Sequence, residues 1–509
     1  MKSKLTFNTF FYLCIFSFAL IFIGCESSKP TEPIEITSEV KLTIIHINDA
    51  HGRTAAEPYI SQIAKEIKSK GNNVLIIDAG DRLHGQVATN LTKGETMVDI
   101  MNTVGYSAMT LGNHDFNFGV KRIQELSTQM NFPILCANVR NSNGENLFKQ
   151  SEIIIMQGLK VGLFGIITPE TVNFSDPRIT EGLFFDDPVQ TARPIVEQLK
   201  KENCDIIIAI AHLGDNINTQ SNWRSDALAS IPEIDIIIDG HSHTLLPNGK
   251  NINNSLIVQA GEFEKYIGIV EVSTSDSKTF TKKSKIIETS ANNYSPDPVI
   301  VAKIKETESK IEPIVSIVVG NTPFLLQGER SIVRTQETNL SNLITNSMLY
   351  ASGAEISFLT GGNIRSSIPA GNITMGDVLV VLPFSNLIVT LDIAGSDLLD
   401  ILEHGIELSP SETPIFIHIA GIYFEYDPNL PPKNKITNIK MADNTPFDIN
   451  KKYTVATTEF LAAGGDGYTM LSKGTNIKYY RDDAEAFADY LATNPEIKPE
   501  PEGRVKIKE

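Results

Sequence analysis

Cysteine is scarce in this chain of 509 residues, which contains four of them. Cys14 and Cys25 lie near the N-terminus, and Cys136 and Cys204 sit beside apolar, strand-like runs. Thiols this few and this widely spaced exclude a disulfide framework and a zinc site built from cysteines. We expect Cys136 and Cys204 to be buried, unpaired thiols.

Positive charge is also in short supply. The chain has 44 lysines and arginines against 61 aspartates and glutamates, a net charge of −17. It therefore offers no summed positive field for a nucleic-acid polymer. A small phosphate-bearing ligand held by a few local arginines is still allowed. The composition, 41% hydrophobic and 21% charged, is that of a globular protein, and the length favours two domains over one core.

The longest hydrophobic run covers residues 10–23 and is shorter than the roughly 20 residues of a membrane-spanning helix. Lys2 and Lys4 precede it, and Gly24-Cys25 ends it in a pattern similar to a bacterial lipobox. We predict a lipoprotein signal peptide over 1–24, lipidation of Cys25, a flexible polar tether over 25–39, and export to a bacterial membrane. A plain signal peptide or membrane anchor is the alternative, and the oligomeric state stays open.

Short apolar runs rich in β-branched residues alternate with helical patterns in the first half of the chain. Such runs are typical of strands covered on both faces. The predicted strands are 41–47, 73–79, 107–111, 160–168, 205–211, 234–240 and 255–261, with helices over 56–70 and 187–202. We predict an α/β domain over 40–294, a linker helix over 295–319 interrupted at Pro313, and a second α/β domain over 320–509 whose last residues are polar and at the surface.

Polar side chains follow five of these runs, where each strand is expected to end. The carboxyl ends of strands form sites at one edge of an open α/β sheet. The side chains are Asp49 and His51, then Asp81, then Asn113 and His114, then His212, and finally His241 and His243.

Carboxylates and imidazoles in this pattern suit zinc, manganese, cobalt or iron better than calcium. Two such ions activate a water and clamp a phosphoryl oxygen. A single histidine or aspartate behind a strand is more often a structural residue or a helix cap. Because polar side chains follow all five strands, we interpret them as ligands of two divalent ions bridged by Asp81 and not as separate structural residues. We leave His46, His84 and Asp115 as structural residues, with Asp115 orienting its own loop.

This ordered set resembles the calcineurin-like metallophosphoesterases and, with the second domain, the 5′-nucleotidase/UDP-sugar hydrolase family over residues 40–505. The resemblance implies a four-layer αββα catalytic domain, a linking helix and a C-terminal substrate domain. It assigns His114 as the catalytic histidine. It also implies a first metal held by Asp49, His51, Asp81 and His243, and a second held by Asp81, Asn113, His212 and His241.

The same resemblance assigns substrate residues in the second domain. Arginine suits the phosphate because its planar fork donates two hydrogen bonds to an oxyanion. Aromatic stacking on a nucleobase tolerates many bases. The implied residues are Arg330, Arg334 and Arg365 for phosphate and neighbouring anionic groups, Phe384 and Phe460 for the base, Asp466 for the ribose, and Asn386 beside them.

The chain departs from the family pattern at Thr360 and Asn363, near Arg365, and at Asn117. Typical 5′-nucleotidases carry an aspartate at the position of Asn117, which pairs with the catalytic histidine and raises its pKa. Asparagine is common there in the 2′,3′-cyclic-nucleotide phosphodiesterase/3′-nucleotidase group, but that group tends to stack bases on tyrosines.

We expect a metal-dependent 5′-nucleotidase acting on nucleoside 5′-monophosphates, with UDP-sugars and nucleoside di- and triphosphates as further substrates. The cyclic phosphodiesterase is the alternative, and a non-catalytic surface-binding lipoprotein is an alternative of another class.

Overall fold

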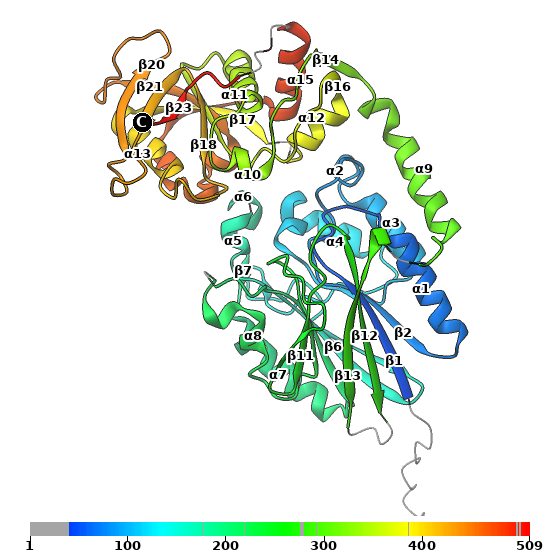
Figure 1. Ribbon diagram of the computed structural model, residues 1–509. Helices are drawn as coiled ribbons and strands as arrows, with labels where there is room; N and C mark the ends of the chain where they lie inside the picture. Colours follow the sequence, from blue (N-terminus) through cyan, green and yellow to red (C-terminus); the bar gives the residue numbers. More distant parts are fainter. Residues whose placement is uncertain are drawn as a thin grey trace, which may run out of the picture.

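The structure is a computed structural model that describes residues 40–508 except 176, 218, 275–278, 292, 385, 495–496 and 498–499. The predicted signal peptide, Cys25 and the tether lie outside the described residues. Figure 1 shows two domains joined along one side by the long helix α9 (Pro298–Val315).

The first domain contains two β-sheets that pack face to face. The first sheet has the order β13 (Thr281–Glu288), β12 (Tyr266–Thr274), β1 (Val40–Ile47), β2 (Asn73–Asp78), β3 (Ala108–Met109). The second has the order β10 (Lys250–Ile252), β11 (Ser255–Val258), β9 (Ile236–Ile238), β8 (Ile206–His212), β6 (Leu159–Ile167), β5 (Ser151–Met156). β1, β2 and β3 are mutually parallel, as are β6, β8, β9 and β11.

Apolar residues form three layers of core around these sheets. Ile44 and Ile77 of the first sheet pack against Leu163 and Ile208 of the second. The outer face of the first sheet is covered by α1 (Glu57–Ser69), α3 (Glu95–Val104) and α4 (Val120–Ser127), and that of the second by α7 (Pro188–Lys201) and α8 (Ser225–Leu228). The predicted four-layer αββα fold is confirmed, and Cys136 and Cys204 are buried free thiols, as expected.

The second domain is built on a five-stranded sheet with helices on both faces. Its order is β18 (Ile417–Ala420), β15 (Ile356–Thr360), β21 (Lys452–Thr458), β17 (Leu387–Ala394), β22 (Thr475–Asp482). One face carries α11 (Asn339–Ser352), α12 (Met375–Val381) and α15 (Asp483–Thr493), and the other carries α13 (Gly395–Gly405). β14 (Val318–Thr322) and β16 (Gly371–Thr374) pair antiparallel in a separate two-stranded sheet.

A three-stranded sheet, β20 (Ile436–Met441), β19 (Ile422–Tyr426), β23 (Val505–Ile507), closes the second domain. The Glu337 carboxylate accepts the backbone N–H groups of Glu502, Arg504 and Val505, and Arg504 donates to the carbonyl of Ile419 at 2.9 Å. The expectation that the last residues all lie at the surface is therefore wrong for Arg504, which is buried. Its guanidinium donates to Thr345, Asn346, Glu502 and the Ile419 carbonyl inside the domain.

Helix α9 starts at a side-chain cap, where Asp297 accepts the N–H of Val299 at 3.1 Å and Pro298 occupies the first turn. The predicted interruption at Pro313 is wrong, because the helix continues to Val315. Pro313 falls in the last turn, where its missing N–H removes a single helical hydrogen bond. None of the described helices is both long and apolar enough to cross a membrane.

The two domains touch where their functional loops face each other. Helix α2 (Val87–Leu91) of the first domain lies against α12 and the turn that follows it. Asn90 Nδ2 donates to the carbonyl of Pro383 at 2.8 Å. On the other side, α5 (Thr171–Phe174) meets the short helix η4 (Gly465–Gly467). Two predicted substrate residues stand at these contacts, since Asp466 belongs to η4 and Phe384 follows Pro383.

Candidate metal centre and active site

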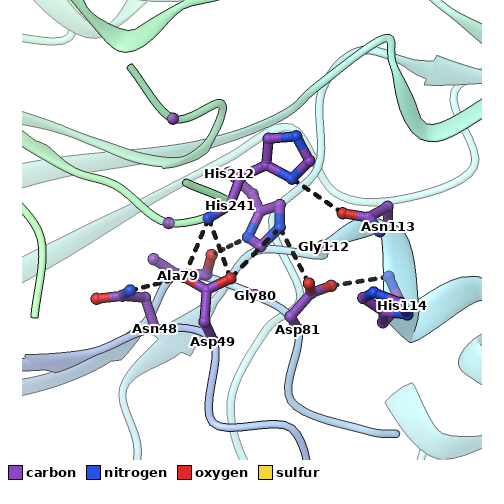
Figure 2. A network of polar contacts seen from close by, with 12 residues as sticks. Asn48, Asp49, Ala79, Gly80, Asp81, Gly112, Asn113, His114, His212 and His241 are labelled. Carbon is purple, nitrogen blue, oxygen red and sulfur yellow. Dashed lines mark hydrogen bonds and ion pairs between the residues drawn. The ribbon is translucent and has the colours of Figure 1, made fainter. Parts of the chain in front are cut away.

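The predicted metal ligands come from the ends of strands in both sheets of the first domain. Asp49 and His51 follow β1, Asp81 follows β2, and Asn113 begins the short helix η1 (Asn113–Phe118) just beyond β3. His212 is the last residue of β8, and His241 and His243 follow β9. Because the two sheets pack face to face, these strand ends meet at one edge (Figure 2).

Asp81 lies at the centre of this group. Its Oδ2 is 3.4 Å from His212 Nε2 and 3.8 Å from His51 Nε2. Asp49 Oδ1 is 3.5 Å from His243 Nε2 and 3.9 Å from His212 Nε2. On the far side, Asn113 Oδ1 is 3.0 Å from His241 Nδ1.

All seven side chains assigned to metals therefore converge, with Asp81 between the two sets. Close groups of possible ligand atoms also single out Asp49, His51 and His243, and Asp49, Asp81 and His212.

Local backbone geometry holds these side chains inward. Asp49, His51, Asp81, His241 and His243 all have positive φ, from 48° to 75°. Such left-handed conformations cost non-glycine residues on the order of 1–3 kcal/mol and persist only where the surroundings impose them.

Neighbouring glycines make room for these ligands. A Cβ on Gly112 would lie 2.2 Å from Asp81 Oδ1, and one on Gly240 would lie 2.9 Å from His212 Nδ1. The glycines in the motifs "GNHD" and "DGHSH" thus allow the ligands to come together.

The residues fit divalent metal ions on several counts. The Nε2 atoms of His51 and His212 are buried and have no hydrogen-bond partner among the described residues. His212 Nδ1 donates to the Ala79 carbonyl at 2.7 Å, and His243 Nδ1 lies 2.6 Å from Glu262 Oε2. Such outer partners fix the tautomer that presents Nε2 to a metal. The chemistry of these side chains therefore fits a site for two divalent ions.

Electrostatics make the cluster attractive to cations. Burial raises the pKa of a carboxyl group, yet His212 and the other histidines hold the pKa of Asp81 well below its usual range. Burial likewise works against a charged His212, but Asp81 and Asp49 raise its pKa to about 10. Two buried carboxylates thus concentrate negative potential where the imidazoles converge.

Asp115 fixes the loops that carry the ligands. Its carboxylate accepts the backbone N–H groups of Asp81, Arg82, Leu83 and Gly112 at 2.7–2.9 Å. Asp115 therefore orients its own loop, as expected, and also ties it to the loop of Asp81.

His114 lies at the edge of the metal cluster. Its backbone N–H donates to Asp81 Oδ1 at 2.7 Å, and its ring centroid is 5.1 Å from that of His51. Burial lowers the pKa of His114 to about 4. The positive charge of Arg365 lowers it too, whereas the negative charge of Asp81 acts in the opposite direction. Asn117 Nδ2 is 3.4 Å from His114 Nδ1 and 3.2 Å from His84 Nδ1. Asn117 thus gives His114 a polar neighbour that carries no charge.

The predicted phosphate arginines face the cluster from the second domain. Arg330 Nε donates to Glu412 Oε1 at 2.9 Å, and Arg334 Nη1 is 4.0 Å from the same atom. The buried Nε of Arg334 has no hydrogen-bond partner among the described residues. Burial, together with repulsion from Arg330 and Arg365, lowers the pKa of Arg334 to about 10. Three guanidinium groups that repel one another are suited to hold an anion.

The glycine turn before Arg365 brings its loop onto the helix of the other arginines. A Cβ on Gly361 would lie 2.3 Å from the Val333 carbonyl. Thr360 Oγ1 is 2.8 Å from Asn363 Oδ1 and donates to Asp466 Oδ2 at 3.0 Å. Thr360 and Asn363, which depart from the family pattern, therefore contact each other, and Thr360 also contacts the predicted ribose residue Asp466.

The predicted base-binding residues and Asn386 have different surroundings in the second domain. The Phe384 ring stacks on His84, with centroids 5.5 Å apart, and the Arg365 guanidinium carbon is 5.6 Å from its centroid. Phe460 covers Gly465, where a Cβ would lie 2.5 Å from the ring. Asn386 Nδ2 reaches Asp483 Oδ2 at 3.5 Å, at the start of α15. The substrate role of Asn386 stays a prediction, as do those of the phenylalanines.

Sequence reasoning misses two neighbours of the site, Glu262 and Arg53, and assigns a third, His84, as a structural residue. Glu262 supports His243, Arg53 lies with its guanidinium carbon 3.8 Å from the Phe263 centroid, and His84 stacks on Phe384. The sequence offers a signal for Arg53, because it stands two residues after the predicted ligand His51 in "NDAHGR". Glu262 carries no comparable local signal.

Comparison with known families accounts for both domains. Residues 42–245 match the calcineurin-like phosphoesterase model, and residues 318–473 match the 5′-nucleotidase C-terminal domain model. The chain belongs to the 5′-nucleotidase family. Membership makes it a metal-dependent phosphoester hydrolase, which confirms the predicted enzyme class.

Individual relatives of this 5′-nucleotidase family member align over nearly all of the chain. It is 29% identical to the 5′-nucleotidase of Vibrio cholerae over 93% of this chain and 94% of that protein. It is 30% identical to the trifunctional nucleotide phosphoesterase YfkN of Bacillus subtilis over 91% of this chain, which spans only 35% of YfkN. A 5′-nucleotidase precursor from Thermus thermophilus superposes with a TM-score of 0.74 at 28% identity, covering 92% of this chain and 99% of that one.

Proposed function

We propose that this protein hydrolyses nucleoside 5′-monophosphates to nucleosides and phosphate. The observation that carries the proposal is the placement of Arg330, Arg334 and Arg365 across from the His/Asp cluster, at the contact between the domains. A phosphate bound by the arginines would face the predicted metal centre. The names of the Vibrio and Thermus relatives agree with this substrate class.

Two divalent ions fit the cluster, one on Asp49, His51, Asp81 and His243 and one on Asp81, Asn113, His212 and His241. Zinc, manganese, cobalt or iron suits this mixed nitrogen and oxygen donor set. Such ions would lower the pKa of a water and neutralise charge on the phosphoryl group. The buried, unpartnered Nε2 atoms of His51 and His212 are the strongest support for this loading.

The side chains of this protein would bind and orient the nucleotide. The arginines hold the phosphate and neighbouring anionic groups with charge-assisted hydrogen bonds. His114, neutral because of its burial, donates a hydrogen bond to a phosphoryl oxygen as charge develops there. Phe384 and Phe460 offer faces to the base, and Asp466 accepts from the ribose hydroxyls. Water then displaces the nucleoside oxygen from phosphorus, and that oxygen takes up a proton.

A second candidate is a 2′,3′-cyclic-nucleotide phosphodiesterase/3′-nucleotidase, which Asn117 favours. Asn117 sits beside His114 without supplying a charge. The trifunctional name of YfkN agrees with a wider nucleotide range for relatives of this kind. A non-catalytic binding lipoprotein is less well supported, because every predicted metal ligand is present and the ligands converge.

We also propose that the protein is exported and anchored to a bacterial membrane by lipid on Cys25. The signal-like run over 10–23 and Gly24-Cys25 support this. A tether over 25–39 would allow the first strand to stand up to about 50 Å from the membrane when fully extended. Lys2 and Lys4 supply the basic start of such a signal.

The deciding experiment is phosphate release by purified protein that starts after Cys25, with Mn²⁺ or Co²⁺ added. AMP, UDP-glucose, ATP and 3′-AMP are assayed directly, and 2′,3′-cyclic AMP with an added phosphomonoesterase. Preference for AMP supports the proposal. Preference for the cyclic or 3′ substrate supports the second candidate, and bound metal without turnover of any of them supports the binding protein.

A further inference from the structure

His84 has no role in the function described so far, yet it occupies the point where the two domains meet. It stands three residues after Asp81, on the loop between β2 and α2, and it is 2% exposed. Its ring is nearly parallel to that of His114, with centroids 6.1 Å apart and an interplanar angle of 11°. Its ring also stacks on Phe384 of the second domain, at 5.5 Å and 10°.

A single amide nitrogen links the two histidines. Asn117 Nδ2 is 3.2 Å from His84 Nδ1 and 3.4 Å from His114 Nδ1. A carboxamide nitrogen carries two hydrogens, so it can donate to both. Each imidazole must then accept at Nδ1 and carry its proton at Nε2.

The second domain contributes the far end of this chain of contacts. His84 hydrogen bonds to the backbone carbonyl of Pro383, which also accepts from Asn90 Nδ2 at 2.8 Å. With Nδ1 of His84 accepting from Asn117, the proton for Pro383 is the one on Nε2. The contacts thus run from Pro383 through His84 and Asn117 to His114.

We propose that His84 is a positioning residue that holds the Asn117 carboxamide, and through it the ring and tautomer of His114. The proposal rests on the proposed function only in that His114 donates from Nε2 to the phosphoryl group. An amide with one acceptor can rotate and present its oxygen instead, whereas two acceptors fix which end faces His114. Docking of Pro383 completes the arrangement.

Two substitutions of His84 separate hydrogen bonding from stacking. His84→Phe keeps a ring against Phe384 but removes both hydrogen bonds, whereas His84→Gln loses the ring and keeps an acceptor and a donor. We expect His84→Phe and Asn117→Ala each to lower kcat about 10–100-fold, as loss of an outer partner typically does. His84→Gln should recover most of the loss, and KM should change little. The double variant His84→Phe/Asn117→Ala should be no worse than Asn117→Ala alone.

The assay uses p-nitrophenyl phosphate beside AMP. Since p-nitrophenyl phosphate has no nucleobase, an effect on kcat that appears with both reports on the phosphoryl end of the site. If p-nitrophenyl phosphate is cleaved and nucleotides are not, the proposed function fails while the role of His84 is still decided. Asn102→Ala removes side-chain hydrogen bonds to the backbone of Gln129 and Asn131, which touch neither His84 nor Pro383, and is the control, expected to leave kcat unchanged.

A second readout does not depend on turnover. With nine histidines in the chain, ¹⁵N spectra of the Zn²⁺-loaded protein can resolve ring tautomers, and His114→Gln assigns the signal. We expect His114 to show the Nε2–H form, and both His84→Phe and Asn117→Ala to shift it. An Nδ1–H form in the unaltered protein would overturn the proposal. A full loss of kcat in His84→Gln with none in His84→Phe would overturn it too, and would assign His84 to packing.

Discussion

The two halves of the site are built differently. In the first domain, Asp49, Asp81 and His212 are almost completely buried, and their positions are fixed by strand ends, glycines and the Asp115 carboxylate. In the second domain, the Arg330 side chain is 57% exposed, Arg365 is exposed and Phe384 is half-buried, and all three stand on short helices or turns. The chemistry is therefore set by the core of one domain, while recognition depends largely on surface loops of the other, with Arg334 as the buried member of the arginine group.

This difference predicts two kinds of failure. Changes in the buried half should remove metal and turnover together, because no other group can replace a ligand there. Changes in the exposed half should weaken substrate binding and leave the metal centre intact. Of the four predictions below, the first three test this division and the fourth tests the stability of the second domain, and they run from the largest expected effect to the smallest.

Asp81→Asn should abolish the link between the two predicted metals. Metals of this kind contribute several kcal/mol to transition-state stabilisation, so kcat should fall on the order of 10³-fold. Metal content, measured by inductively coupled plasma mass spectrometry, should fall below the expected two ions per chain. A thermal unfolding scan controls for folding. Near-normal turnover with two bound ions would remove Asp81 from the bridge.

Arg365→Ala should lower kcat/KM for AMP about 10–100-fold, since a hydrogen bond to a charged group contributes about 1.5–3 kcal/mol. Metal content should stay the same as in the unaltered protein. Steady-state kinetics and metal analysis on one preparation decide this. Loss of metal in this variant would break the division between the halves.

Phe460→Ala should raise KM for AMP about tenfold, because stacking on one base contributes about 1–3 kcal/mol. Kinetics on p-nitrophenyl phosphate should hardly change, since that substrate has no base. Equal effects on both substrates would mean that Phe460 supports the fold around Gly465 instead of the base.

Acid should lower the free energy of unfolding of the second domain, because His418 takes up a proton more readily in the unfolded chain than in the folded one. Burial lowers the pKa of His418 to about 4, although its hydrogen bond to the Val333 carbonyl acts in the opposite direction. The unfolded chain therefore binds more protons than the folded one below about pH 6.5, so this contribution to stability is lost as the pH falls toward 4.

At pH 5 the loss is roughly 2 kcal/mol, or a few degrees in the unfolding temperature. Calorimetry of the metal-free protein between pH 7 and pH 5 measures it. His418→Gln should flatten that part of the pH dependence, and an unchanged slope would contradict the assignment.

Periodicity in the sequence predicts the buried parts of this molecule well. The apolar runs of β1, β2, β6 and β8 start and end within about two residues of their predicted bounds, because both faces of these strands are covered. The strands β5, β12 and β13 were not predicted. β13, with the sequence TKKSKIIE over Thr281–Glu288, contains three lysines and only two apolar residues, and it lies at a sheet edge, where a strand does not need a continuous apolar run.

The site divides in the same way. The metal-ligand candidates stand directly behind predictable strands, so their convergence follows from the topology. The contacts of His84 join it to Asn117, Pro383 and Phe384, and Glu262 meets His243 from the next loop. Such pairings depend on how loops dock in three dimensions, which no local pattern encodes. Asn117 is an example. The sequence shows that an asparagine stands near the catalytic histidine, but it does not show that this asparagine also contacts His84.

The Glu337–Arg504 contacts have a consequence for the order in which the protein is made. All predicted metal ligands, and the Glu262 and Glu264 carboxylates beside them, lie before α9, so they have been synthesised long before the second domain is finished. The second domain joins Glu337 to residues 502–505, a span of some 165 residues. During synthesis the metal ligands can therefore come together while the second domain still lacks its last strand, and the contacts of His84 with Pro383 and Phe384 form afterwards.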